Sequence, residues 1–527
     1  MIIFVTIMLN LFYSILSGLL LSFSWPESGF FPLIFIAFIP LLNLEESLSS
    51  VIKKKFSASL FLYVLLSFFI FNIITTYWIY HATLFGAIMA FLINSLLMTC
   101  AFYLFHVIKF YLGKRLGLLS FILIWVSMEY IHLNWDLSWP WLTLGNVFAN
   151  FPSLIQWYEY TGVLGGSFWV LSVNVLLFRL IKYKREKLNF FSLIFMFFTP
   201  VLISLYMYYN FNDTQYNKIN VVIGQPNIDP YEDKFVIDPK KQIDDFIQYA
   251  SSEIKQETQL LLGPETMLQE SIWENKIESS YSIQALRSLQ NKLPNLNILI
   301  GASSYNIVSK NKHNKYSVRE FLNSKDLYEA YNSAIFLPDS GDIEIYHKTE
   351  LVPGVETTPF PWLFNKVAAF SVDLGGISGS LGDYNKLNTF KNKELNILPL
   401  ICYESIYGEL ASSKFFNLIC IITNDGWWKN TAGYKQHLAY ARIRAIENRR
   451  AVVRSANTGI SSSINMRGDI IEKTKWDTVD FINVDVSLND RSTFYNRFGD
   501  YIGRICVFFS VILCLITFVK RKIKPAK

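Results

Sequence analysis

The stretch Leu395-Asn-Ile-Leu-Pro-Leu-Ile-Cys402-Tyr-Glu-Ser405 places a cysteine at the end of an apolar run. The run predicts a buried strand, and residues 406–416 predict a helix directly after it. A thiol at such a junction faces the unpaired N–H groups of a helical first turn, which lower a thiol pKa and stabilise an oxyanion. The alternative is an inert core cysteine beside a strand, which is common.

Two further strand ends favour a reactive cysteine. One is Leu260-Leu-Leu-Gly-Pro-Glu265, and the other is Ile345-Tyr-His-Lys348, followed by Leu351-Val-Pro353-Gly-Val-Glu356. Because strand ends on one edge of a sheet converge, we expect Glu265, Lys348 and Cys402 to meet in one pocket. A carboxylate can take the thiol proton and return it to a leaving group. An ammonium, with the backbone N–H after Cys402, can stabilise the oxyanion.

The composition excludes an ordinary soluble protein of this size. The 527 residues are 52% hydrophobic, 16% aromatic and only 17% charged. The formal net charge of +6 comes from clustered basic residues, which makes nucleic acid a poor candidate partner. The cysteines and histidines have no spacing typical of a metal site or a disulfide framework.

Eight long, predominantly apolar runs predict membrane-spanning helices, since most can cross a hydrocarbon core of about 30 Å. They cover residues 2–23, 29–44, 57–80, 84–108, 116–133, 160–181, 189–211 and 499–519. The first run has no basic start and no cleavage site, so we expect a retained anchor. Basic residues occupy alternate loops, at Lys53–Lys55, Lys109–Arg115, Arg179–Lys187 and from Lys520 onward. By the positive-inside rule, these loops and both termini are cytoplasmic.

This pattern divides the chain into three regions. Residues 1–215 form an N-terminal transmembrane domain of about seven helices, and residues 497–527 form a last helix with a basic cytoplasmic tail. Between them, residues 216–496 alternate strand and helix patterns and form an α/β domain outside the cytoplasm. Its expected elements include strands at 219–224, 258–263, 297–303, 419–423, 451–455 and 461–465, helices at 239–256 and 434–448, and a hairpin across 332–347.

Two loops have unusual compositions. The aromatic-rich loop 134–160 is either an interfacial belt or a mouth through which lipid reaches the α/β domain. The glycine-rich stretch Gly375–Gly382 fits no nucleotide-binding pattern, and we expect a mobile loop.

These motifs resemble the carbon–nitrogen hydrolase (nitrilase) superfamily. With spans on both sides, the full chain resembles its membrane-bound branch, the apolipoprotein N-acyltransferases. The matching motifs are Pro264-Glu265 for the general base, Lys348 with Leu351-Val-Pro353 and Glu356, Ile401-Cys402-Tyr403-Glu404 for the nucleophile, Gln225-Pro-Asn-Ile, Asn424-Asp-Gly-Trp427, Gln436-His437 and Arg454-Ser-Ala-Asn457-Thr-Gly459. Gly263 stands where many members have tryptophan, and Gly354-Val355 where many have Phe-Gly. Neither departure removes a reacting group.

The resemblance implies a multi-pass α-helical membrane domain of about eight spans and an α/β nitrilase-like αββα sandwich. It implies transfer of an acyl chain from a phospholipid, phosphatidylethanolamine, through a thioester on Cys402 to the amine of a diacylglyceryl-cysteine at an apolipoprotein N-terminus. Glu265 would be the base and Lys348 the oxyanion stabiliser. The implied setting is a monomer in the bacterial inner membrane with the α/β domain on the periplasmic side, with no metal and no organic cofactor.

Several nearby residues have two interpretations. The resemblance assigns supporting roles to Glu356, Tyr403 and Glu404, whereas Glu356 could be a loop-surface residue and Glu404 a carboxylate favoured at a helix N-terminus. Asn332 either holds the pocket through its amide or is a turn residue. Trp427 and Trp428 line an acyl groove or pack in the core, and His437 is expected to be a packed helix residue rather than a catalyst.

Two other functions compete with acyl transfer. One is a tethered amidase or nitrilase that uses water as the acceptor, for which one span would suffice. The other is a transporter or receptor with a non-catalytic domain. Such a protein should carry ionisable residues buried within its spans, and the apolar runs contain almost none.

Overall fold

The structure is a computed structural model that describes residues 2–27, 29–52, 57–183, 187–213, 215–309, 316–322, 324–361, 380–382, 387–412 and 414–523. The predicted cytoplasmic placement of Lys53–Lys55 and Lys184, and most of the loop expected at 375–382, concern residues outside these ranges. The chain forms two compact units. The first is Met1–Tyr80, Leu84–Asn210 and Phe498–Lys527, and the second is His81–Thr83 and Phe211–Arg497.

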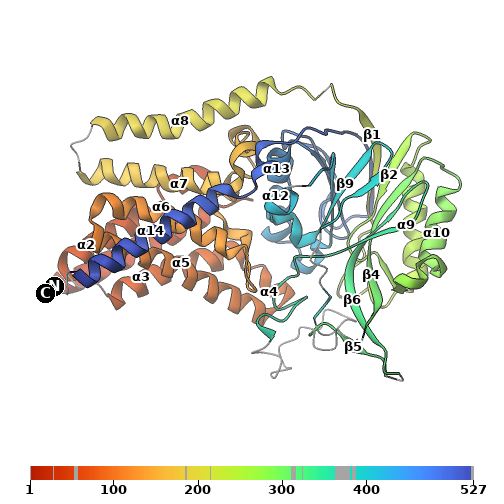
Figure 1. The fold of residues 1–527 in the computed structure, drawn as a ribbon, viewed down its shortest axis with the longest axis horizontal. Helices are drawn as coiled ribbons and strands as arrows, with labels where there is room; N and C mark the ends of the chain where they lie inside the picture. Colours follow the sequence, from red (N-terminus) through yellow and green to blue (C-terminus); the bar gives the residue numbers. More distant parts are fainter. Residues whose placement is uncertain are drawn as a thin grey trace. The chain divides into compact units, whose positions relative to one another are not determined.

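The first unit is built from apolar helices (Figure 1). Within the described residues, eight helical segments are long and apolar enough to span a membrane, which confirms the predicted multi-pass architecture. They are α1 (Ile2–Phe23), the 3-10 helix η1 (Phe31–Phe35) with α2 (Ile39–Ile52), α3 (Ala58–Thr76), α5 (Leu84–Leu112), α6 (Lys114–His132), α7 (Tyr158–Tyr183), α8 (Lys187–Asn210) and α14 (Tyr501–Ile523).

Two local signals explain how the second and third spans begin. Pro32 and Pro40 lie in the first turns of η1 and α2, where a residue without an N–H removes no helical hydrogen bond. Because Pro40 cannot continue a helix from η1, the second span consists of two helical pieces. Ser57 caps α3, because its hydroxyl accepts the N–H of Leu60 at 3.2 Å.

Helices α2 and α5 continue past the predicted runs 29–44 and 84–108, and ionisable groups are buried near these ends. Glu45 of α2 is buried and lies 2.8 Å from His106 Nδ1 of α5, and it also forms an ion pair with Lys109 of the same helix. Lys109 further contacts Glu46 at 2.6 Å. Each charge is thus paired between two helices, which is how ionisable groups persist in an apolar bundle. This pairing joins α2 to α5. Helix packing therefore explains the buried charges, and they do not require a transport pathway.

The aromatic-rich loop of the first unit is folded and largely buried. It contains three 3-10 turns, η2 (Pro140–Leu142), η3 (Leu144–Phe148) and η4 (Pro152–Leu154). The Trp141 ring lies 4.6 Å from the Trp78 ring and stacks on Trp139 at 5.5 Å. The Glu129 carboxylate holds the loop by accepting the N–H of Leu144 at 2.9 Å. Because Trp141 is buried in this unit, it contributes little surface to an exposed interfacial belt.

The second unit contains two β-sheets. One has the order β14-β1-β2-β4-β6-β5, with β3 on β4 and β7 on β6, and the other has the order β13-β12-β11-β10-β9-β8. Their strands are β1 (Lys218–Gln225), β2 (Thr258–Leu262), β3 (Leu268–Trp273), β4 (Asn297–Val308), β5 (Arg319–Glu320), β6 (Leu327–Leu337), β7 (Glu344–His347), β8 (Phe390–Asn392), β9 (Leu395–Ile401), β10 (Leu418–Thr423), β11 (Ala451–Ala456), β12 (Ser462–Ile464), β13 (Ile470–Lys473) and β14 (Asp480–Ser487).

The sheets form the two central layers of a four-layer sandwich. Apolar residues of β1 and β2 pack against those of β9, β10 and β11 in a core between the sheets. A second core joins the other face of the larger sheet to α9 (Pro239–Glu253) and α10 (Tyr281–Gln290). Figure 1 shows these two helices outside the larger sheet and α12 (Ala432–Asn448) outside the smaller one. The predicted αββα sandwich is therefore confirmed.

Most predicted elements of this unit are present, and one is wrong. The predicted hairpin is β6–β7, in which Ser333 pairs with His347. The helix expected over 406–416 is replaced by two 3-10 turns, η8 (Cys402–Ile406) and η9 (Glu409–Ala411). Tyr407 adopts an extended backbone and ends η8. Gly408 follows, where a Cβ would lie 2.4 Å from the Tyr495 hydroxyl. The helical path therefore ends at Tyr407, and the missing side chain of Gly408 leaves room for Tyr495.

Candidate active site

Three strand ends bring the predicted reacting residues together, but not along one sheet edge as expected. Glu265 follows β2 and Lys348 follows β7, both in the larger sheet, whereas Cys402 follows β9 in the smaller sheet. The thiol interacts electrostatically with both Glu265 and Lys348, so the three groups share one buried site. They meet because the two sheets face each other across a common core, not because their strands are neighbours.

Lys348 is held between two carboxylates. Its Nζ lies 3.5 Å from Glu265 Oε1 and 2.9 Å from Glu356, and the side chain is 1% exposed. Burial alone lowers the pKa of Lys348, but Glu356 and Glu265 outweigh burial, and the pKa is raised. Lys348 is therefore a permanent cation. The interpretation of Glu356 as a partner of Lys348 agrees with this geometry.

Asn332 links the same two carboxylates. Its Nδ2 donates to Glu265 Oε1 at 2.8 Å and to Glu356 Oε1 at 3.0 Å. Asn332 lies in β6 and its backbone carbonyl accepts the N–H of Lys348 at 2.9 Å. One residue thus orients the carboxylates and the backbone of the lysine, which matches the pocket-holding interpretation rather than a turn residue.

Cys402 has a strained backbone that its neighbours hold in place. Its φ of 50° lies in the left-handed region, which is uncommon outside glycine and concentrates at functional sites. The Cys402 carbonyl accepts a hydrogen bond from Ser405 Oγ at 2.7 Å and lies 3.1 Å from His437 Nε2. His437 is buried and lies 3.0 Å from Asp425, which pairs with Arg454. His437 is therefore a packed residue of α12 that contacts the backbone carbonyl of Cys402.

The electrostatics of the thiol differ from the expectation of a lowered pKa. Burial raises the pKa of Cys402, the Glu265 carboxylate raises it further, and Lys348 opposes the change only in part. At neutral pH the resting residue is a thiol, so a nucleophilic thiolate requires that a base take its proton at the moment of attack. The 3-10 turn that begins at Cys402 does not offset the cost of burial.

Glu404 bridges the segments that carry Cys402 and Lys348. Its Oε2 accepts the N–H of Ile401 at 2.8 Å, and its Oε1 accepts the Tyr346 hydroxyl at 2.5 Å and the N–H of Thr349 at 2.7 Å. The carboxylate is fully buried, and burial raises its pKa. These bonds cross from one sheet to the other, a larger role than capping a helix.

The remaining aromatic candidates lie beside the site. Tyr403 is 4% exposed, and its ring meets the Tyr407 ring edge-on at 5.3 Å. Trp427 contacts the Tyr231 ring at 5.2 Å, and Trp428 contacts the His437 ring at 5.5 Å. Both tryptophans are half-buried, so they pack and still offer part of their surface.

The structure adds one residue that the sequence did not reveal. Lys234 is 5% exposed and interacts electrostatically with Glu265 and Cys402. It lies between Asp233 and Phe235 in a segment with neither strand nor helix periodicity, where a lysine is usually solvated. No local pattern distinguishes it from a surface residue.

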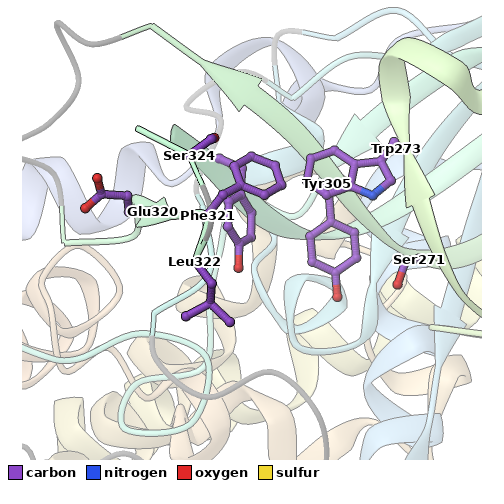
Figure 2. Close-up of a pocket in the computed structure, with 8 residues that line it drawn as sticks. Ser271, Trp273, Tyr305, Glu320, Phe321, Leu322 and Ser324 are labelled. Atoms are coloured by element: carbon purple, nitrogen blue, oxygen red, sulfur yellow. The ribbon is translucent and has the colours of Figure 1, made fainter. Parts of the chain in front are cut away.

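An open pocket of about 510 Å³ lies elsewhere in the second unit, and none of the three predicted reacting residues lines it. Figure 2 shows Trp273, Tyr305 and Phe321 around it, with Glu320 and Leu322 on the loop side. The Trp273 ring stacks on Phe321 at 5.3 Å, so the pocket is the exposed edge of an aromatic cluster. Among the residues with described placement, no group of three histidines, cysteines or acids could hold a metal ion.

Comparisons with known proteins agree with the two-unit architecture. Residues 17–176 match the family described as apolipoprotein N-acyltransferase N-terminal domain, and residues 220–495 match the carbon-nitrogen hydrolase family. The apolipoprotein N-acyltransferase of Chlorobaculum tepidum is 30% identical over 97% of both chains. That of Geobacter metallireducens is 28% identical over 97% of this chain and 95% of its own.

Among solved structures, Saccharomyces cerevisiae Nit3, a member of branch 10 of the nitrilase superfamily, covers 51% of this chain and 90% of its own. Its sequence identity is 19% and its TM-score is 0.37. The full-length relatives and the two family matches establish that the chain belongs to the apolipoprotein N-acyltransferases, a membrane-bound branch of the carbon–nitrogen hydrolase family.

Proposed function

We propose that this acyltransferase moves an acyl chain from a phospholipid, with phosphatidylethanolamine as the donor, to the N-terminal amine of an S-diacylglyceryl-cysteine on an apolipoprotein. This would be the last step of lipoprotein maturation. The observation that carries the proposal is the buried cluster of Glu265, Lys348 and Cys402, which supplies a base, a cation and a thiol. The names of the relatives supply the class of acceptor.

In the first half-reaction, Glu265 takes the proton of the Cys402 thiol as the sulfur attacks the ester carbonyl of the donor. The negative charge passes to the carbonyl oxygen, where the Lys348 ammonium and the backbone N–H of Tyr403 stabilise it. The intermediate then collapses, the ester C–O bond breaks, and Glu265 returns the proton to the departing alkoxide. The products are a thioester on Cys402 and a lysophospholipid.

In the second half-reaction, the deprotonated amine of the acceptor attacks the thioester. Glu265 takes a proton from the attacking nitrogen, the C–S bond breaks, and the proton returns to the sulfur. Since the acceptor enters as an ammonium, one proton per turnover is released to solvent. Both substrates are bulky, so we propose ping-pong order, with the lysophospholipid leaving before the acceptor binds.

The supporting residues act through these three. Glu356 keeps Lys348 charged and oriented, and Glu404 fixes the turn that begins at Cys402 relative to the segment after Lys348. We assign no separate chemical step to either carboxylate. All reacting groups come from one chain, so a monomer suffices.

We propose that residues 1–215 and 497–527 lie in the bacterial inner membrane and that residues 216–496 face the periplasm, with both termini in the cytoplasm. The eight apolar helical segments support the membrane placement, and the alternation of basic loops supports the orientation. This arrangement gives the thiol access to substrates on the outer side of the membrane.

An acyl-transfer assay with purified full-length chain tests the proposal. Phosphatidylethanolamine with a labelled acyl chain is supplied in micelles with a peptide whose N-terminal cysteine carries a diacylglyceryl group. We expect labelled amide on the peptide and an equal amount of lysophospholipid, and neither with Cys402→Ala. Release of labelled fatty acid at a rate independent of the peptide would instead establish a tethered hydrolase.

A further inference from the structure

Lys234 is a buried ammonium fixed beside the reacting residues. It lies in the segment between β1 and α9, where its N–H donates to the Asp229 carbonyl at 2.9 Å and its carbonyl accepts Gln242 Nε2 at 2.9 Å. Its ammonium donates to Thr266 Oγ1, on the residue directly after Glu265. Thr266 has a φ of 48°, which is unusual for a β-branched residue, so the hydrogen bond to Lys234 holds a strained turn.

Among the described residues, no carboxylate forms an ion pair with this ammonium. Two neutral groups lie beside it, the Thr266 hydroxyl and the Trp427 ring, whose centroid is 6.0 Å away. The charged or ionisable groups that interact with it are Glu265, from the end of β2, and Cys402, from the end of β9. Burial lowers the pKa of Lys234 to about 8, although Glu265 and Cys402 oppose that change. A buried cation without a direct ion-pair partner is costly and is often retained for function.

A charge count shows what this cation does for the site. Lys348 is already shared by Glu265 and Glu356, so these three groups together carry one negative charge. With Lys234 included, these four groups are two cations and two carboxylates; the buried Glu404 carboxyl, which also interacts with Lys348, is not part of this set. Asp425, the other carboxylate that interacts with the thiol, is paired with Arg454. Without Lys234, the thiolate would form in a cluster with an excess negative charge, which raises a thiol pKa.

We propose that Lys234 is a second cationic group of the reaction centre, which stabilises negative charge as it moves from Glu265 to the Cys402 sulfur and then to the oxyanion. The thiol proton moves to Glu265, the S–C bond forms, and the carbonyl oxygen takes the charge, while Lys234 stays protonated throughout. This inference rests on the proposed function, and it adds an electrostatic requirement to the same site.

The test measures Cys402 reactivity in the full-length enzyme. The rate of iodoacetamide alkylation is followed against pH, with the mass of the Cys402 peptide as the readout. In Lys234→Met we expect the midpoint of the alkylation profile to move to higher pH and the acyl-transfer kcat to fall at least about tenfold. The control is Lys240→Met, which removes an exposed lysine of α9 and should change neither quantity.

A folded Lys234→Met enzyme with an unchanged alkylation midpoint and wild-type kcat would overturn the inference. If Lys234→Met does not fold, Lys234→Arg provides the test instead. A guanidinium stays charged at the alkaline pH at which the Lys234 ammonium loses its proton. The alkaline limb of the acyl-transfer profile should then extend to higher pH, and an unchanged limb would overturn the inference. Acyl-Cys402 is measured in the wild-type enzyme of the same preparation, and its absence there would contradict the proposed function instead.

Discussion

Glu404 Oε1 accepts the backbone N–H of Thr349 at 2.7 Å, while the other oxygen of the same carboxylate accepts the N–H of Ile401 at 2.8 Å. Thr349 follows Lys348, and Ile401 precedes Cys402, so one buried side chain spans the two segments that carry the cation and the nucleophile. Because those segments come from different sheets, this carboxylate sets a distance that the sheet hydrogen bonds do not.

We therefore expect Glu404→Gln to reduce kcat about 10- to 100-fold while KM changes little. An amide keeps one acceptor but turns a donor toward a backbone N–H, so one side of the bridge is lost and left unsatisfied. Steady-state acyl transfer and thermal unfolding of the same preparation check this expectation. Wild-type kcat in Glu404→Gln would show that the bridge does not position the site.

Lys348→Ala should abolish turnover without unfolding the α/β unit. Losing a donor that stabilises an oxyanion costs on the order of 3 kcal/mol of barrier. Lys348→Arg should fail as well, since a broad planar guanidinium does not fit between Glu265 and Glu356 as a compact ammonium does. Acyl transfer is measured together with circular dichroism, and near-normal activity in either folded variant would reduce Lys348 to a structural residue.

Glu350 predicts a pH dependence of stability. Burial and the neighbouring Glu404 raise its pKa from 4.5 to about 7. Between these pH values the folded state binds more protons than the unfolded state, so the free energy of unfolding falls as pH rises, by up to about 3 kcal/mol. Between pH 5 and pH 7.5, the apparent Tm of Glu350→Gln should therefore fall by less than the apparent Tm of wild type. Glu257→Gln, at an exposed carboxylate, should behave as wild type, and equal slopes in all three would refute the assignment.

The proposed orientation predicts which sites a membrane-impermeant maleimide can reach in cells with a permeabilised outer membrane. Ser251→Cys, on the exposed side of α9, should be labelled, whereas Lys522→Cys, at the end of α14, should be labelled only after the inner membrane is opened. The wild-type chain gives the background from native cysteines. Labelling of Lys522→Cys before lysis would reverse the topology.

The sequence predicted the architecture well, because its signals are local. Span positions follow from uncharged length, and the strands that carry Glu265 and Cys402 follow from short apolar runs bounded by turn residues. The hairpin before Lys348 follows from turn chemistry at 338–341. These signals require no knowledge of distant contacts.

The errors all concern contacts between distant segments. The helix expected after Cys402 is broken at Tyr407, whose backbone is extended, next to the close contact of Gly408 with Tyr495. The thiol pKa, expected to be lowered, is instead raised by burial and by Glu265. Lys234 was missed because its environment is made by Thr266 and Trp427. In the same way, Glu45 and Lys109 lie just beyond the predicted runs 29–44 and 84–108, and only the fold shows that they pair.

The central claim is that Cys402 carries the acyl chain between donor and acceptor. The most direct measurement is the mass of the Cys402 peptide after full-length enzyme is incubated with phosphatidylethanolamine and no acceptor. The account predicts a hydroxylamine-sensitive acyl adduct on Cys402, with lysophospholipid released in equal amount, and discharge of the adduct when the diacylglyceryl peptide is added. Release of lysophospholipid only when the acceptor is present, with no acyl adduct on Cys402 under any condition, would contradict it.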